Sequence, residues 1–79
     1  MQEGAALVQV VRGIAEEGRV ALRNIRRDVM HDLRELRDAG EAGADDEHRA
    51  EEALQKLTDE KVRELDGLLK AKEDEILEV

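Results

Sequence analysis

The first 39 residues contain seven arginines and no lysine, and the spacing of these arginines is the pattern that points most clearly to a chemical role. On a helical wheel of about 100° per residue, they share one arc roughly 100° wide. The set comprises Arg12, Arg19, Arg23, Arg26, Arg27, Arg34 and Arg37. A guanidinium group binds phosphate through a planar, bidentate fork. A straight row of such groups therefore favours the backbone of a nucleic acid as its ligand.

The middle of this arc is the strongest candidate for an RNA-binding surface. No acidic residue occurs from Gly18 to Arg27, so nothing dilutes the positive charge there. The chain has no Phe, Trp or Tyr, and recognition would therefore use phosphate, sugar and shape instead of base stacking. We expect Arg23 and Arg26 to point away from the core. The candidate RNA-binding residues are Arg12, Arg19, Arg23, Arg26 and Arg27.

Two simpler roles remain open for these arginines. They could form an ordinary solvated helix face, or they could pair with acids from the second half of the chain. Residues 1–39 contain seven basic and seven acidic residues, whereas residues 40–79 contain six basic and fourteen acidic residues and carry the whole net charge of −8. Arg49 and Arg63 lie in that acidic half. We expect both to contribute little to RNA binding, because nearby carboxylates repel phosphate.

No arrangement of residues supports catalysis or a cofactor. The chain has no Cys, which excludes a disulfide scaffold, a Cys-ligated zinc site and a thiol nucleophile. The two histidines, His31 and His48, lack a partner at the spacing of a metal motif. Thr58 is the only hydroxyl side chain, and no general base accompanies it. We therefore predict no catalytic residues, no metal ligands and no enzyme activity.

The elements that position the arginines follow from the hydrophobic periodicity. Apolar residues recur at steps of three and four on both sides of a single Gly-rich break, which is typical of amphipathic helices. The break is Gly40-Glu41-Ala42-Gly43, and the chain has no proline. We predict helices over 2–39 and 44–78, joined by a turn over 40–43. Gly18 lies on the apolar face of the first helix, where it would allow a close helix approach.

The fold class that follows is all-α: a long antiparallel two-helix hairpin that forms a single helical domain over 1–79. Two helices cannot enclose a core, so each apolar stripe keeps one flank open to water. We expect two hairpins to pair into a helical bundle as a homodimer, with candidate contacts at Val8, Ile14, Val29, Leu33 and Leu65. No apolar run approaches the ~18 residues of a membrane span. No membrane partner is therefore expected, and the composition is compatible with the cytoplasm.

The arginine-rich segment also resembles a known family. The run Val11-Arg12-Gly13, the run from Glu16 to Asp28 and the run QKLTD at 55–59 are similar to the C-terminal part of bacterial ribosome recycling factor. The ending from Lys72 to Val79 is similar as well, so the resemblance covers roughly residues 10–79. It implies a cytoplasmic role in ribosome disassembly after translation termination. It also implies that ribosomal RNA of the large subunit contacts the face carrying Arg19, Arg23, Arg26 and Arg27.

The chain departs from this family in what it lacks. The family's helical domain is a three-helix bundle with a smaller β domain inserted between the first and second helices, and this chain resembles only the second and third helices. The β domain is the part that meets elongation factor G, so a contact with that factor is not expected here. Glu3, Gly4 and Ala5 also stand where the family tends to have basic residues. An excised fragment, a short homologue, or an engineered or truncated hairpin that only homodimerises would fit this arrangement.

Overall fold

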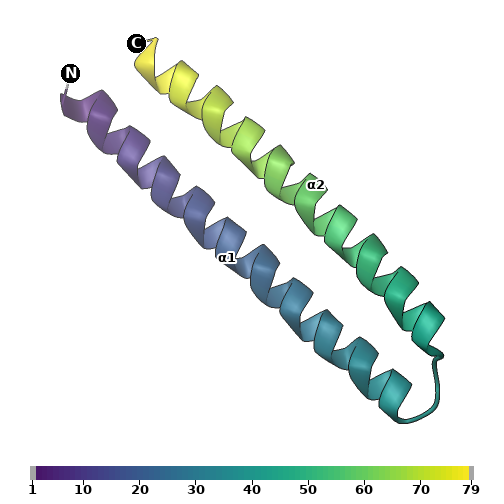
Figure 1. Cartoon of the computed structure of the whole chain (residues 1–79). Helices are drawn as coiled ribbons and strands as arrows, with labels where there is room; N and C mark the ends of the chain where they lie inside the picture. Colours follow the sequence, from purple (N-terminus) through teal and green to yellow (C-terminus); the bar gives the residue numbers. More distant parts are fainter. Residues whose placement is uncertain (1, 79) are drawn as a thin grey trace.

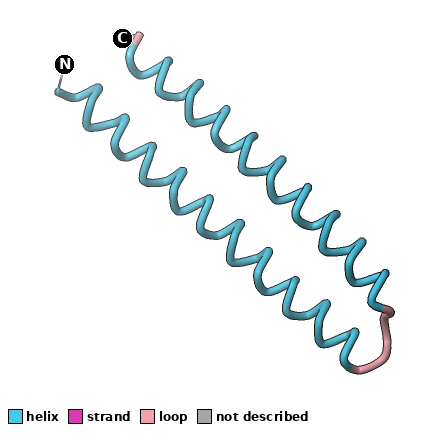
Figure 2. Tube along the Cα trace, viewed as in Figure 1, coloured by secondary structure: helices cyan, strands magenta, loops and turns pink. Residues whose placement is uncertain are grey.

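The computed structural model describes residues 2–78 and consists of two long helices that run side by side in opposite directions (Figure 1). Helix α1 spans Gln2–Asp38 and helix α2 spans Ala44–Leu77. The Cα trace shows helix on both sides and a single connecting loop (Figure 2). The described part of the chain contains no strand, and the prediction of an all-α antiparallel hairpin is confirmed. The single domain over 1–79 stays a prediction, and its two end residues, Met1 and Val79, lie outside the described residues.

Each helix ends one residue earlier than the sequence predicts, and the end of α1 has a clear cause. Gly40 has a φ of 75°, a left-handed conformation that costs glycine little. The Gly40 N–H donates to the carbonyl of Arg37 and the Glu41 N–H donates to the carbonyl of Leu36, both at 2.9 Å. This pair of bonds is a Schellman motif, which satisfies carbonyls that the end of a helix leaves free.

Helix α2 begins at a backbone cap. Gly43 is the N-cap residue in an extended conformation, without a side-chain hydrogen bond to the helix. The Glu47 N–H donates to the Gly43 carbonyl at 3.0 Å. Asp45, Asp46 and Glu47 occupy the first turn, where negative charge interacts favourably with the helix dipole.

The two helices meet along a narrow seam of small and medium side chains. Val8 and Ala15 of α1 are buried, with exposed fractions of 5% and 4%. A Cβ added to Gly18 would lie 3.0 Å from Cδ2 of Leu65, so the prediction of a close approach at Gly18 is confirmed. On α2, Thr58 is buried and its hydroxyl donates to the Leu54 carbonyl at 2.8 Å.

The seam does not coincide with the centre of the predicted apolar stripe. The buried side chains of Val8 and Ala15 lie at one edge of that stripe, so α1 turns this edge toward α2. Arg26 and Met30 are half-buried on this side of α1, although Arg26 belongs to the arginine arc. The expectation that Arg26 points away from the core was therefore wrong.

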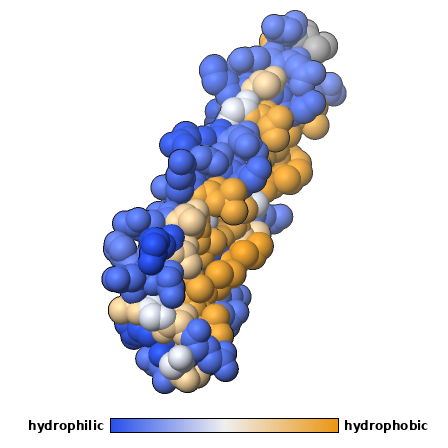
Figure 3. Space-filling model, turned by 90° about the vertical axis from the view of Figure 1, so that its right-hand side faces the viewer, coloured by the Kyte–Doolittle hydropathy of each residue, from blue (hydrophilic) through white to orange (hydrophobic). Residues whose placement is uncertain are grey.

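Because the seam lies at one edge of the apolar stripe, much of the stripe stays exposed. The molecule is a rod with extents of 59 × 15 × 9 Å. An apolar band follows one face of the molecule between hydrophilic flanks (Figure 3). The large apolar side chains that remain exposed are Leu7, Val10, Ile14, Val20, Ile25, Val29, Leu36, Leu57, Leu68 and Leu77. Of the predicted dimer contacts, Val8 is buried within the hairpin and is inaccessible to a second chain.

Candidate nucleic-acid interface

The structure divides the arginines of α1 into those that bridge to α2 and those that do not. Arg12 Nε lies 2.6 Å from Glu73 Oε1 near the open end of the hairpin. Arg37 Nη1 lies 3.1 Å from Glu47 Oε1 near the turn. These contacts correspond to the simpler role in which arginines of α1 pair with acids from the second half of the chain.

Arg19 is the most firmly held of the candidate residues. Its Nε donates to Glu16 Oε2 at 2.9 Å within α1, and its Nη1 donates to Asp66 of α2. The hydrogen bond to Glu16, followed by the one to Asp66, raises the pKa of Arg19 above its ordinary value. With 20% of its side chain exposed and two carboxylates as partners, Arg19 is poorly placed to bind phosphate.

Arg26 is half-buried but has no carboxylate partner among residues 2–78. Its Nη1 donates to the Gln55 amide oxygen at 3.4 Å, and the amide nitrogen of Gln55 donates to Asp59 at 2.9 Å. Arg26 lies at the edge of the seam, and no carboxylate contact there offsets its positive charge.

Arg23 and Arg27 are the exposed candidates that form no bridge to a carboxylate of α2. Both are exposed, and Arg23 forms no ion pair within the described part of the chain. Arg27 has 72% of its side chain exposed, and its contact with the neighbouring Asp28 is long at 3.6 Å. These two residues form the part of the predicted arginine face that is exposed and not bridged to α2.

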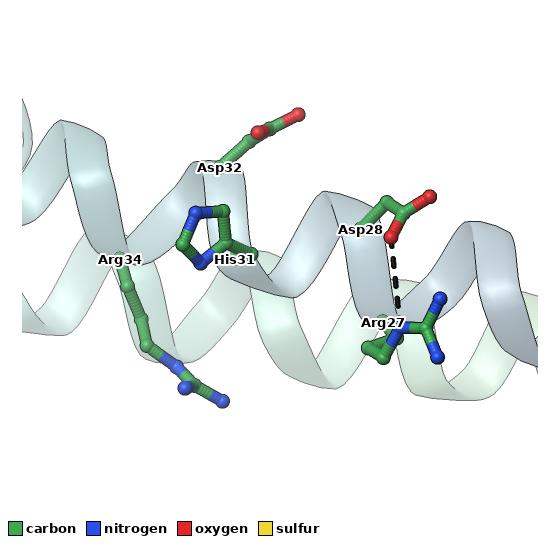
Figure 4. Close-up of a pocket in the computed structure, with 5 residues that line it drawn as sticks. All are labelled: Arg27, Asp28, His31, Asp32 and Arg34. Carbon is green, nitrogen blue, oxygen red and sulfur yellow. Dashed lines mark ion pairs between the residues drawn. The ribbon is translucent and has the colours of Figure 1, made fainter.

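A shallow hollow further along α1 is lined by mixed charges. Its residues are Arg27, Asp28, His31, Asp32 and Arg34 (Figure 4). The side chains of Asp32 and Arg34 point in opposite directions, and Asp28 turns toward Arg27. His31 also lies 3.1 Å from Glu35. Because acidic and basic groups alternate here, this hollow has no surplus of positive charge with which to attract phosphate.

A second hollow, of about 390 Å³, lies across the middle of the hairpin and was not expected. Its lining combines both helices: Arg23, Arg26, Thr58, Asp59, Val62 and Arg63. The sequence placed Arg63 in an acidic surrounding, but the structure puts it in the same groove as two arginines of α1. A period of 3.6 residues places Arg63 on its own helix and cannot show which residues of the other helix lie opposite it.

Other chemistry has little support in the described residues. Residues 2–78 contain no group of three metal-ligating side chains arranged to hold an ion. No helix within this range is long and apolar enough to cross a bilayer. One polar atom stands out, since Oε2 of the buried Glu47 has no hydrogen-bond partner in the described structure.

Comparison with known proteins gives a family match. The family described as Ribosome recycling factor matches residues 3–77. The ribosome-recycling factor of Rubrobacter xylanophilus is 55% identical over 73 residues, which cover 92% of this chain and 39% of the relative. That of Alcanivorax borkumensis is 51% identical over 73 residues, which cover 92% of this chain and 40% of the relative. The chain thus spans about 40% of the length of the curated relatives it matches.

Proposed function

This chain belongs to the ribosome recycling factor family, and we propose that it is a non-enzymatic helical module that binds ribosomal RNA of the large subunit. The binding surface is the exposed arginine face of α1, centred on Arg23 and Arg27. Its place of action is the ribosome in the cytoplasm, in the disassembly that follows translation termination.

The observation that carries this proposal is which arginines of α1 bridge to α2 and which do not. Arg12, Arg19 and Arg37 each pair with a carboxylate of α2. Arg23 and Arg27 lie between them and are exposed. Because acidic residues dominate the rest of the chain, a polyanion would be attracted to this central stretch and repelled elsewhere.

The proposal narrows the predicted site. Arg23 and Arg27 are direct phosphate ligands, and Arg26 adds positive charge from the edge of the seam. Arg12 and Arg19 hold α2 in place and contact RNA only if their carboxylate partners are displaced. This assignment follows from the cost of breaking a charge-assisted hydrogen bond to make another.

The proposal covers attachment to RNA and does not extend to splitting the ribosomal subunits. The chain spans about 40% of its relatives' length, and the family's contact with elongation factor G is assigned to a domain this chain does not resemble. The family match over residues 3–77 also does not favour the alternative of an engineered or truncated hairpin with a purely structural role.

The test compares two double variants that remove the same charge. Arg23→Ala/Arg27→Ala removes the exposed pair, whereas Arg49→Ala/Lys72→Ala removes two cations that pair with local acids, Asp46 and Glu75. Binding to a structured fragment of large-subunit ribosomal RNA is measured at several salt concentrations, with helicity checked by circular dichroism.

We expect the first double variant to weaken binding about tenfold, and to reduce the slope of log affinity against log salt by about 0.9 for each phosphate that the protein no longer neutralises. The control should change both quantities little. Equal effects of the two variants would show that attraction is nonspecific and would refute a special role for the arginine face.

A second proposal concerns how the chain covers its apolar flank. On a helical wheel, Leu7, Ile14 and Ile25 lie about 90° to one side of the seam, and Leu57 and Leu68 of α2 fall on the same side. All five are more than half exposed, and an apolar band of this kind runs along the rod (Figure 3). We propose that two copies of this chain pair through this flank, because exposed apolar bands of this extent mark association sites.

The pairing is compatible with RNA binding because the two surfaces are on opposite sides of the hairpin. The wheel places Arg23 and Arg27 more than 90° from the apolar flank of α1. A dimer joined through the apolar flank would therefore present two arginine faces outward.

A further inference from the structure

The groove across the middle of the hairpin concentrates positive charge from both helices. Arg23 and Arg26 reach it from α1 and Arg63 reaches it from α2, with Thr58, Asp59 and Val62 completing the lining. Three guanidinium groups against one carboxylate leave a surplus of positive charge in an open space of about 390 Å³. Such a space accommodates one phosphate group together with bound water.

The arginines of this groove differ from those elsewhere along the seam. Arg12, Arg19 and Arg37 each have a carboxylate of α2 within hydrogen-bond distance. Within residues 2–78, neither Arg23 nor Arg63 forms an ion pair, and Arg26 donates only to an amide oxygen. The cations facing this groove are therefore uncompensated by contact, although the chain as a whole is strongly acidic.

The polar neighbours of these arginines are already committed to other partners. The hydroxyl of Thr58 donates to the Leu54 carbonyl at 2.8 Å. Asp59 Oδ1 accepts a hydrogen bond from Gln55 at 2.9 Å. Asp59 lowers the positive potential of the groove without forming an ion pair with Arg23 or Arg63 in the described structure.

We propose that one RNA phosphate binds across the seam between Arg23 of α1 and Arg63 of α2. This inference rests on the proposed function and deepens it, because it adds a ligand from the acidic helix to the arginine face. A phosphate held by two guanidinium groups on different helices receives donors from two directions. The contact also requires both helices in register, so RNA binding and hairpin formation support each other.

The test uses single variants of exposed arginines on the same helix. Arg63→Ala removes the proposed ligand, and Arg49→Ala is the matched control because Arg49 is exposed and pairs locally with Asp46. Affinity for the same ribosomal RNA fragment is measured across a salt series. We expect Arg63→Ala to reduce the salt slope by about 0.9, and Arg49→Ala to leave it unchanged.

Three further variants examine the shared phosphate: Asp59→Asn, Arg23→Ala and the double variant Arg23→Ala/Arg63→Ala. Asp59→Asn should tighten RNA binding, because it removes the only carboxylate lining the groove. The reductions in affinity caused by Arg23→Ala and Arg63→Ala should be less than additive, because either change disrupts the same phosphate contact. Circular dichroism and the oligomeric state of each variant show whether the hairpin is retained.

The possible failures are distinguishable. If Arg23→Ala/Arg27→Ala weakens binding while Arg63→Ala behaves like Arg49→Ala, the cross-seam phosphate is refuted and the proposed function stands. If neither weakens binding, both fail. Fully additive reductions for Arg23→Ala and Arg63→Ala would also overturn the shared phosphate, since they would show two independent binding contributions.

Discussion

At the scale of single residues, the contact between Gly18 and Leu65 sets how closely the helices approach. A Cβ at Gly18 would lie 3.0 Å from a methyl carbon of Leu65, which is tighter than ordinary van der Waals contact. A Cβ at Gly13 would meet nothing within 4 Å. Both glycines lie inside α1, where each weakens the helix relative to alanine.

The two positions should therefore respond differently to alanine. We expect Gly13→Ala to raise the free energy of unfolding by about 0.5–1 kcal/mol. Gly18→Ala gains the same helix propensity but forces Leu65 to move, so its net gain should be smaller or negative. Urea denaturation at one fixed protein concentration measures both. Equal stabilisation by the two substitutions would contradict the close approach at Gly18.

At the scale of elements, the two helices were predictable from the sequence, but the way they face each other was not. The period of apolar residues defined each helix, and Gly40 and Gly43 marked the turn, because no other breaker interrupts the pattern. A wheel gives angles around one helix axis and contains no information on the direction of the partner. For that reason the sequence predicts that Arg26 points away from the core, although it lies half-buried at the seam.

For the candidate site, the sequence showed which residues share a face but not which of them pair with α2. The common arc of the arginines was visible in the sequence, and so was the possibility that they pair with acids of the second helix. Which arginines take which role depended on the register of α2, since Glu73 and Asp66 lie opposite Arg12 and Arg19. The presence of Arg63 and Arg23 in one groove depended on the same register.

The Arg37–Glu47 contact joins the end of α1 to the start of α2 and should be sensitive to mutation. Only 10% of the Glu47 side chain is exposed, and its second carboxylate oxygen has no partner in the described structure. Arg37→Ala leaves this buried carboxylate without its cation, which we expect to cost about 1–3 kcal/mol of unfolding free energy.

The matched variant removes both charges. Arg37→Ala/Glu47→Leu should recover most of the stability that the single variant forfeits, because an apolar side chain needs no partner when buried. Thermal denaturation of the three proteins makes the comparison. A single variant as stable as the parent chain would show that water satisfies Glu47 in solution.

At the scale of the whole molecule, the two helices of the hairpin leave a large apolar surface exposed to water. The buried apolar core of the described residues consists of Val8 and Ala15. Small helical scaffolds generally need association to supply the missing burial. This expectation came from the sequence, and the position of the exposed flank indicates where association would occur.

The proposed dimer predicts a mass and a variant that abolishes it. Sedimentation equilibrium at micromolar concentration should give twice the chain mass of 8.9 kDa. Ile14→Glu/Ile25→Glu places charges on the flank, where both residues are about 60% exposed, and should give the monomer mass. Val20→Glu is the control, because Val20 is 45% exposed but lies on the other side of α1. A parent chain that sediments at 8.9 kDa with full helicity would refute the dimer.

The placement of the two ends at one pole of the rod, opposite the turn (Figure 1), also determines how the hairpin responds to mechanical force. A pull on both ends acts across the seam and not along it, so the load falls first on the layer nearest the ends, around Val8. Each set of contacts between the helices carries the load only after the set nearer the ends has separated. The hairpin should therefore peel apart gradually from its open end, with the Schellman turn and the Arg37–Glu47 contact as the last parts to separate.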